Sequence, residues 1–269
     1  MGTRATKRSD VFLNYHLYGE PDGPAKVDYF FWILRNQHRT VIVDTGFSPR
    51  AGLKRDRELL LHPRQALMEL SIEPDDVNDV ILTHGHYDHI GNADLFPQAT
   101  FHMAEAEYRF WNSPTAAHTQ FSHYAEEVEI GYLRQRHHAG KLNLFRGQCS
   151  PAPGLEVVEV GGHTPGQAMV RLQTTAGPVI LASDAVHFYE ELERDMPFIA
   201  ISSLPEMYDV FLHLRDQARA ANAIIVPGHD PDVLHRFTPH ESALGGNAVT
   251  IGDLPVSREE KEHHASDQI

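Results

Sequence analysis

The residues best suited to chemistry stand together in one short segment, which reads Thr83-His84-Gly85-His86-Tyr87-Asp88-His89. Three imidazoles and a carboxylate fall within six residues, directly after an apolar run. Imidazole nitrogen and carboxylate oxygen are the ligands that zinc and similar divalent ions prefer. Gly85 has no side chain to obstruct the approach of its two histidine neighbours. The alternative, an ordinary polar loop, has no structural need for so many titratable groups, so the segment predicts a metal site.

Three further polar residues each stand just after an apolar run. His163 follows Leu155–Val160 in a glycine turn, Asp184 ends the run Val179–Ser183, and His229 follows Ile224–Val226 after Pro-Gly. Each is ambiguous alone, because a histidine in a turn is often structural. Loops at strand ends are where sites collect in sheet-based enzymes. The repeated geometry therefore predicts one site built by His84, His86, Asp88, His89, His163, Asp184 and His229.

Short strands and helices are expected to position these segments. Predicted strands cover Val11–Tyr18, Val27–Arg35, Thr40–Asp44, Asp79–Thr83, Leu155–Val160, Ala168–Gln173, Pro178–Ala182 and Ile224–Val226. Predicted helices cover Pro63–Leu70, Glu105–Trp111 and Tyr124–His138, with another beginning at the capping-box pattern Ser203–Glu206. In each half of the chain, one strand ends on Asp and a later strand leads into His. Two similar β-rich halves that face each other would explain this echo.

Length and composition favour one large α/β domain. The chain has 269 residues, of which 22% are charged and 41% hydrophobic. We expect a single domain over residues 1–252, with a helical insertion around 105–146 and a charged, flexible tail over 253–269.

Charge and cysteine content narrow the expected partners and compartment. Lys+Arg 23 against Asp+Glu 37 gives a net charge of −14, which disfavours nucleic acid as a partner. Cys149 is the only cysteine, so no intrachain disulfide is expected. No apolar run is long enough to span a membrane, and no secretory signal pattern is present. A cytoplasmic protein without a membrane partner is therefore expected.

The order and spacing of the seven residues resemble the metallo-β-lactamase superfamily, from about Asp44 to His229. Asp44-Thr45-Gly46 also resembles an early aspartate turn of that family. The resemblance implies an α/β fold of the αβ/βα sandwich type, with two mixed β-sheets face to face and helices outside. It implies one metal ion held by His84, His86 and His163, a second held by Asp88, His89 and His229, and Asp184 bridging both.

Two divalent ions about 3.5–4 Å apart share a hydroxide and lower its pKa from 15.7 toward 7. That hydroxide is expected to attack a carbonyl carbon, and Asp88 is expected to carry a proton to the leaving group in addition to ligating. The ligand set favours zinc and accepts iron, manganese or cobalt.

Within the superfamily, the sequence looks most like the N-acyl homoserine lactonase branch, whose ligand pattern and Pro-Gly-His-Asp segment it shares at Pro227–Asp230. This implies a hydrolase that opens the lactone ring of a small molecule, such as an N-acyl homoserine lactone in quorum quenching, and it suggests a homodimer. The branch has a catalytic tyrosine three residues after the bridging aspartate, where this chain has His187. The predicted catalytic residues are therefore Asp88, Asp184 and His187, with Tyr189 as the alternative to His187.

Two questions stay open at the level of sequence. The aromatic residues Tyr108, Phe110, Trp111, Phe121, Tyr124 and Tyr132 line a substrate pocket or a dimer contact in one interpretation, and pack on their own core in the other. For function, the alternatives are hydrolysis of another carbonyl substrate, such as a cyclic amide or imide, a thioester or another ester, and a non-hydrolytic metal-binding redox protein. A glyoxalase II type thioesterase would carry a longer C-terminal domain, and a diiron oxidoreductase would have Glu in place of His86.

Overall fold

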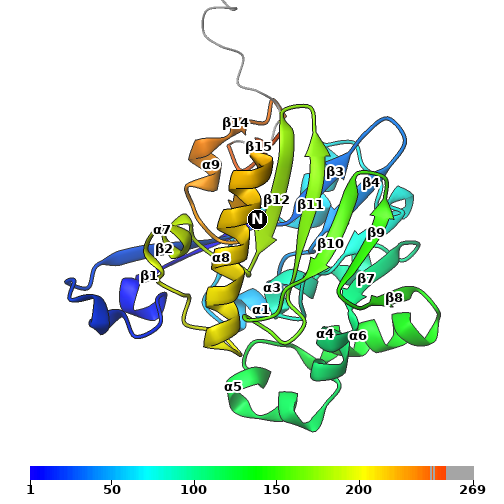
Figure 1. The fold of residues 1–269 in the computed structure, drawn as a ribbon. Coiled ribbons are helices and arrows are strands. Elements are labelled where there is room, and N and C mark those ends of the chain that lie inside the picture. Colours follow the sequence, from blue (N-terminus) through cyan, green and yellow to red (C-terminus); the bar gives the residue numbers. More distant parts are fainter. Residues whose placement is uncertain (243, 245, 253–269) are drawn as a thin grey trace, which may run out of the picture.

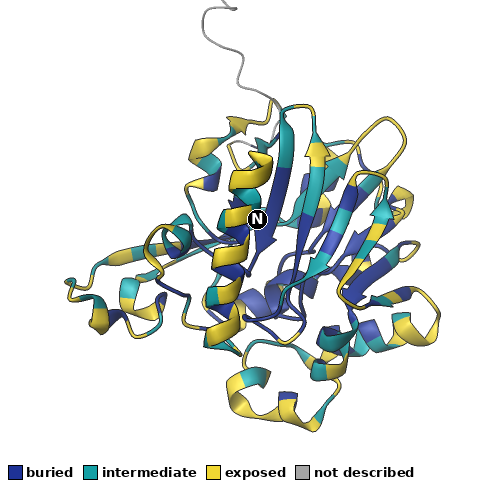
Figure 2. Ribbon diagram, in the orientation of Figure 1, coloured by how far each residue is buried: buried dark blue, intermediate teal, exposed yellow. Residues whose placement is uncertain are grey.

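The structure, a computed structural model, describes residues 1–242, 244 and 246–252. Two five-stranded sheets face each other, and helices cover both outer faces (Figure 1). The strands of both sheets are largely buried, whereas α8 exposes its outward side to solvent (Figure 2). The predicted αβ/βα sandwich is confirmed.

The first sheet has the order β3-β4-β6-β7-β8, with β3 antiparallel to β4 and the remaining pairs parallel. Its strands are β3 (Trp32–Arg35), β4 (Thr40–Val43), β6 (Asp79–Ile81), β7 (Thr100–Ala104) and β8 (Leu142–Phe145). Parallel strands covered on both faces are mostly apolar, which explains Val80 and Ile81 of β6. On the outer face, Val80 and Phe101 pack in one cluster with Leu67 of α2 (Pro63–Glu69) and Ile130 of α6 (Glu127–His138).

The second sheet has the order β13-β12-β11-β10-β9 and is antiparallel except for the pair β12–β13. Its strands are β9 (Gln148–Ala152), β10 (Leu155–Glu159), β11 (Ala168–Thr174), β12 (Gly177–Ser183) and β13 (Ile224–Pro227). The long helix α8 (Leu204–Ala221) covers the outer face. Met207, Val210, Phe211 and Leu214 of α8 recur at helical spacing and pack against Ile180.

The inner faces of the two sheets share one core, in which Val43 and Ile81 meet Val170 and Leu181. Each sheet contains a parallel pair next to this core, β4–β6 in the first and β12–β13 in the second. Asp44 follows β4 and Asp184 follows β12, while His84 and His229 lie after the partner strands. The Asp-then-His pattern that recurs in the two halves of the sequence therefore corresponds to two parallel strand pairs that face each other.

The predicted strand Val11–Tyr18 is wrong. The end of this segment forms the 3₁₀ helix η2 (Tyr15–Tyr18). Another 3₁₀ helix, η1 (Arg8–Asp10), precedes the segment, and the strand lies earlier still, at β1 (Gly2–Lys7). Asn14 has a left-handed backbone with φ 50°, which interrupts an extended chain. Phe12 instead packs against Phe188, with ring centroids 5.8 Å apart, and Tyr15 packs against Phe12 in the same buried cluster.

The predicted strand Val27–Arg35 is divided between two sheets. Its first part belongs to β2 (Pro24–Tyr29), which joins β1 and β5 (Glu58–Leu59) in a three-stranded sheet, and its second part is β3. The remaining elements, in chain order, are α1 (Pro49–Lys54), η3 (Pro74–Asp76), α3 (Tyr87–Ile90), η4 (Ala93–Leu95), α4 (Glu105–Trp111), η5 (Pro114–Ala117), α5 (Thr119–Ser122), α7 (Tyr189–Arg194), α9 (Val233–Arg236), β14 (Thr238–Pro239) and β15 (Val249–Thr250).

The region predicted as a helical insertion contains α4, with the predicted bounds, and α6, which begins at Glu127 rather than Tyr124. Its end is β8, which pairs with β7, so the region is joined to the first sheet. The single-domain boundary at 252 stays a prediction, and the predicted tail over 253–269 lies outside the described residues.

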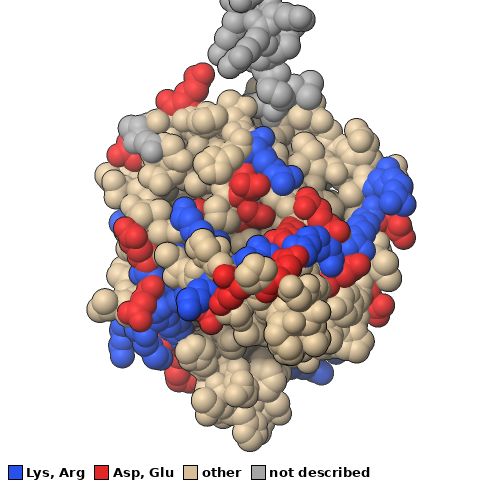
Figure 3. Space-filling view, turned by 90° about the vertical axis from the view of Figure 1, so that its left-hand side faces the viewer, with Lys and Arg blue, Asp and Glu red and all other residues tan. Residues whose placement is uncertain are grey.

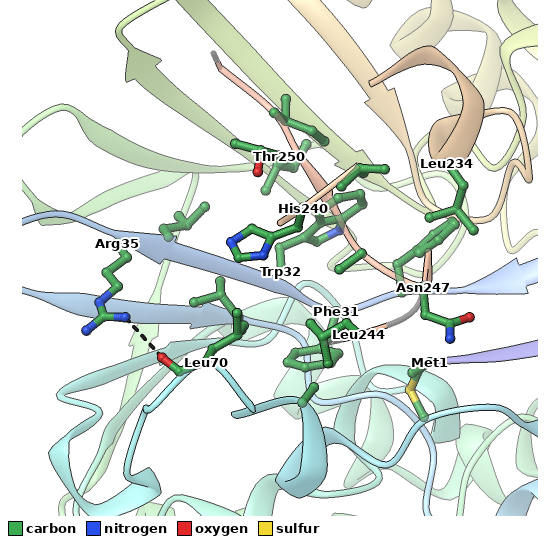
Figure 4. A pocket seen from close by; sticks show the side chains of 18 of the residues that line it. Met1, Phe31, Trp32, Arg35, Leu70, Leu234, His240, Leu244, Asn247 and Thr250 are labelled. Carbon is green, nitrogen blue, oxygen red and sulfur yellow. Dashed lines mark hydrogen bonds between the residues drawn. The ribbon is translucent and has the colours of Figure 1, made fainter. Parts of the chain in front are cut away.

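A mainly apolar cavity of about 260 Å³ lies along the edge strand β3. Phe31, Trp32, Leu234 and the His240 ring line it, and Met1 lies at one end (Figure 4). None of the seven predicted ligands lines this cavity, so it is separate from the predicted metal site.

On the face that carries the β1–β2 ribbon, basic and acidic side chains are interspersed (Figure 3). Arg8, for example, pairs with Glu190 at 2.7 Å, and Arg194 also pairs with Glu190 and with Glu20. Within the described part of the chain, no helix has both the length and the apolar character needed to cross a membrane.

Candidate metal centre

The side chains of all seven predicted residues come together beyond the strand ends of both sheets. They form two groups, in each of which one potential ligand atom per residue lies within 4.8 Å of the others. Every one of the seven is buried. The first group contains His84, His86, His163 and Asp184, and the second contains Asp88, His89 and His229.

Asp184 stands between the two groups. Its Oδ2 lies 3.4 Å from His163 Nε2 and 3.8 Å from His84 Nε2. Its Oδ1 lies 3.2 Å from His89 Nε2 and 3.1 Å from His229 Nε2. His229 Nε2 also lies 3.2 Å from Oδ2, so the Asp184 carboxylate lies between the two groups, with Oδ2 toward the first and Oδ1 toward the second.

Several buried polar atoms of this cluster have no hydrogen-bond partner among the described residues. An unpaired polar atom inside a protein costs about 1–3 kcal/mol, and such atoms are rare in folded chains. A cluster of unpaired nitrogen and carboxylate lone pairs is the donor set that divalent metal ions accept, so the residues present fit a pair of such ions. The unpaired atoms that face the cluster are His84 Nε2, His89 Nε2 and Asp184 Oδ1.

Burial sets the protonation of the first group. It lowers the pKa of His84 and His86 well below the ordinary value and lowers the pKa of His163 to about 3. These imidazoles are therefore neutral and keep their lone pairs, which is the form that binds metal.

The carboxylates act in the opposite direction at the centre of the cluster. Burial opposes the charged form of His89, but Asp184 and Asp44 outweigh it and raise the pKa of His89 well above the ordinary value. Burial likewise opposes the charge of Asp184, and His229 and His89 outweigh it and hold the pKa of Asp184 well below the ordinary range. The cluster therefore holds an ionised, buried carboxylate, and positive charge placed beside that carboxylate is stabilised.

Asp44 orients the second group from outside it. Its Oδ2 lies 2.8 Å from His89 Nδ1, and its Oδ1 accepts from Thr83 N at 2.8 Å. This contact leaves His89 Nε2 facing Asp184. His229 is fixed in the same way, since its Nδ1 donates to the Asp28 carbonyl oxygen at 2.7 Å. Hydrogen bonds of this kind fix the ring orientation of metal-ligating histidines.

The turn that carries His163 depends on close backbone packing. Gly162 has φ 85°, and a side chain there would meet the Met207 sulfur of α8 at 2.8 Å. The Gly162 N–H donates to Glu206 Oε2 at 3.1 Å. Glu206 therefore does not complete the predicted capping box, in which its carboxylate would return to Ser203; it holds the His163 turn instead.

Glu107 of α4 is a site residue that sequence reasoning missed. It is fully buried, and its Oε1 accepts from Gly85 N at 2.8 Å and from Trp111 Nε1 at 2.6 Å. Its Oε2 accepts from Gly166 N at 2.9 Å. One carboxylate thus joins the His84–His86 loop to the His163 turn. The only sequence signal was a pair of glycine turns whose N–H groups needed an acceptor.

His187 lies fully buried against Asp184. Its Nε2 is 3.1 Å from Asp184 Oδ2 and its Nδ1 is 3.3 Å from Glu191 Oε1. The ring stacks on Phe198 with centroids 3.9 Å apart. Burial opposes its charged form, but Asp184 and Glu191 raise the pKa of His187 to about 9. Tyr189, the alternative residue, packs its ring under the Arg236 guanidinium at 3.7 Å.

The chain belongs to the metallo-beta-lactamase superfamily, whose family model matches residues 28–237. This confirms the family expected from the sequence. Among curated relatives, an N-acyl homoserine lactonase of Bacillus sp. is 27% identical over 215 residues, covering 74% of this chain and 80% of the relative. A probable metallo-hydrolase of Mycobacterium tuberculosis is 30% identical over 222 residues, covering 72% of this chain and 68% of the relative.

Solved structures show the same fold. A quorum-quenching N-acyl homoserine lactone lactonase superposes with a TM-score of 0.71 at 21% identity, covering 86% of this chain and 90% of that one. A probable metal-dependent hydrolase from Staphylococcus aureus gives a TM-score of 0.72 at 14% identity and covers 95% of each chain.

Proposed function

We propose that this protein is a dinuclear metal-dependent hydrolase that opens the ring of a lactone. The observation that carries the proposal is Asp184, which turns one carboxylate oxygen toward each of two buried ligand groups. The curated relatives named N-acyl homoserine lactonases support a cyclic ester as the substrate class, and an N-acyl homoserine lactone as one member of it.

The two groups divide the metal-binding work. His84, His86 and His163 would hold one ion, Asp88, His89 and His229 the other, and Asp184 both. When bound, two divalent ions supply a nucleophile at neutral pH and polarise a carbonyl oxygen. Histidine-rich sites with a few carboxylates suit zinc, which we propose as the native metal.

Asp88 is proposed to move a proton. Its Oδ2 lies 3.8 Å from His89 Nε2 and 3.7 Å from His229 Nε2, at the second group. A carboxylate there accepts a proton and returns it to the alkoxide oxygen that leaves when the ring opens.

His187 is proposed to act on the reaction through Asp184 rather than on the substrate itself. Its side chain is fully buried, and its Nε2 faces the Asp184 carboxylate. Glu191 holds it from the other side and also accepts from the His187 backbone N–H at 2.6 Å. A ring nitrogen 3.1 Å from a ligating carboxylate oxygen would orient that carboxylate and tune its basicity.

The proposal extends to compartment and assembly. A chain whose single cysteine, Cys149, excludes intrachain disulfides suits a reducing compartment such as the cytoplasm.

The family resemblance supports a homodimer, and sedimentation velocity of the purified protein measures its mass in solution directly.

The test of the proposed function combines elemental analysis of the purified protein with a pH-indicator assay on lactones, thioesters, β-lactams and phosphodiesters. We expect about two metal ions per chain and lactone opening that chelation abolishes. Two ions without lactone turnover would move the activity to another carbonyl substrate. Absence of bound metal after reconstitution with zinc would overturn the proposal.

A further inference from the structure

The cavity of about 260 Å³ along β3 is lined by residues of both sheets. Residues 30–35, which contain the edge strand β3, line it in succession. Because successive side chains of a strand point to opposite faces, the cavity reaches round the free edge of β3. Leu172, Val179 and Leu181 of the second sheet also line it. The cavity therefore lies where the sandwich opens at the edge of the first sheet.

The chain after β13 covers this open edge. In this cover, β14 pairs with β15, and the Gly252 carbonyl oxygen accepts from Ala176 N at 2.9 Å. Val249 and Ile251 of the cover line the cavity and pack in the cluster between the sheets, together with Trp32. The cover is thus tied to the second sheet by a hydrogen bond and to the core by apolar contacts.

The lining is mainly apolar, and most of its polar side chains come from the cover. Arg35 is the only Lys, Arg, Asp or Glu among the described residues of the lining, and its exposed side chain donates to the Leu70 carbonyl oxygen at 3.3 Å (Figure 4). His240, Asn247 and Thr250 are the polar residues of the cover. A charged occupant would lose its hydration against this lining, whereas a single hydroxyl group has hydrogen-bonding partners at the cover.

The volume sets the size of a matching occupant. An apolar cavity of about 150 Å³ is large enough to bind benzene. By that measure, the cavity along β3 has room for roughly ten heavy atoms. An apolar occupant of this size supplies dispersion contacts to the side chains around it.

This cavity is separate from the metal centre, since none of the seven predicted ligands lines it. A smaller cavity, of about 150 Å³, lies beside His86 and His163. Four of the six aromatic residues noted in the sequence line the smaller cavity, namely Phe110, Trp111, Phe121 and Tyr124. The two tryptophans of the chain are therefore divided between the cavities, with Trp32 at the larger and Trp111 at the smaller.

We propose that the cavity along β3 is a second ligand site of this protein, for an uncharged, mainly apolar molecule of about ten heavy atoms with a polar group at one end. The inference goes beyond the proposed function, because the lining contains none of the predicted metal ligands and the occupant is bound without being hydrolysed.

Calorimetry of the zinc-loaded protein with primary alcohols of increasing length tests the site. Each buried methylene strengthens binding about fourfold. We expect the affinity to rise about 100-fold from 1-pentanol to 1-nonanol, which has about ten heavy atoms, and to level off beyond that length. Nonylammonium, which has the same length but carries a charge, is expected to bind about tenfold more weakly or worse. Affinity that keeps rising to 1-dodecanol, or equal affinity for nonylammonium, would overturn the proposal.

The two tryptophans locate the bound probe. The bromine of 8-bromo-1-octanol, a molecule of the size of 1-nonanol, quenches tryptophan fluorescence on contact. We expect quenching that persists in Trp111→Phe and disappears in Trp32→Phe. The opposite pattern would place the probe at the smaller cavity, and the proposal would be wrong.

Filling the cavity provides an independent check. Val249→Trp adds a large ring to the lining and is expected to weaken the binding of 1-nonanol at least tenfold. Thr238→Trp, on the partner strand β14 but outside the lining, is the matched control and should leave that binding unchanged.

A second variant decides the question if Val249→Trp does not fold. Leu234→Gln keeps the size of the side chain but places a polar amide in the lining, so it should weaken the binding of 1-nonanol at least fivefold. Unchanged binding in Leu234→Gln would contradict the site. Lactone turnover enters none of these measurements, so their outcome is independent of the proposed function.

Discussion

The Asp184 carboxylate faces both ligand groups, so its replacement is expected to affect both groups at once. Asp184→Asn keeps the shape of the side chain but removes its negative charge and one acceptor oxygen. We expect metal content to fall from about two ions to one or fewer per chain, and lactone turnover to fall at least 100-fold. Elemental analysis after gel filtration measures the first quantity. Retention of two tightly held ions would contradict the bridging role.

Replacing His187 distinguishes a role in positioning Asp184 from direct contact with the substrate. His187→Phe keeps an aromatic ring to stack on Phe198 and removes both nitrogens that face Asp184 and Glu191. If His187 positions Asp184, metal affinity falls about 10- to 100-fold, and Glu191→Gln reproduces part of that loss. Competition with a chromophoric chelator measures the affinity. Unchanged metal affinity with lost turnover would instead support direct contact between His187 and the substrate.

At the scale of elements, α4 holds two loops of the site through Glu107. Glu107→Ala would leave three buried N–H groups without an acceptor, at about 1–3 kcal/mol each. We expect the free energy of unfolding to fall by roughly 3 kcal/mol or more in urea, with weaker metal binding. Glu105→Ala on the same helix removes surface ion pairs with Arg109 and Arg146 and should change stability far less. Equal losses of unfolding free energy in the two variants would argue against the role of Glu107 in joining the two loops.

Helix α6 carries a buried carboxyl that makes stability depend on pH. Burial raises the pKa of Glu129 from 4.5 to about 7, and one of its oxygens has no hydrogen-bond partner among the described residues. The folded state therefore holds this proton more tightly than the unfolded state, and stability falls as pH rises from about 4 to 7. About 2.5 pH units at 1.36 kcal/mol each gives roughly 3 kcal/mol.

Glu129→Gln is expected to remove that slope. Urea unfolding at a series of pH values measures it, and Glu127→Gln, an exposed residue of the same helix, serves as the control. A slope that persists in Glu129→Gln would assign the dependence to another group.

At the scale of the whole molecule, the proposed metal centre would join the two sheets. Ligands after β6 belong to the first sheet, and those after β10, β12 and β13 belong to the second. Metal that binds only the folded chain stabilises it by about 4 kcal/mol at a free concentration 1,000 times the dissociation constant. We therefore expect a chelator to lower the melting temperature of the native protein by several degrees. Asp184→Asn should show a much smaller response, and equal responses would count against a structural role for the metal.

The types and spacing of residues in the sequence were sufficient to indicate the family by resemblance and to select the seven residues that the structure brings together, and the family resemblance in turn implied the sandwich fold. This was possible because each of these residues lies in the loop or short helix that follows an apolar strand, and the strand ends of facing sheets meet at one edge. Local patterns also placed α4 and α8 close to their observed positions, since capping residues and helical spacing act between near neighbours in the chain.

Other features depended on contacts between residues far apart in the sequence. The aromatic segment Val11–Tyr18 had the composition of a strand, but packing on Phe188 decided its conformation. Glu107 became a site residue only because folding brought Gly85 and Gly166 to opposite oxygens of one carboxylate. The burial of His187 beneath Phe198 likewise has no local signature. The sequence by itself determined which groups can bind metal, because chemistry belongs to residue type. Only the tertiary structure decided which of these side chains face one another, because the distances between side chains from different strands are set by the packing of the two sheets and their helices.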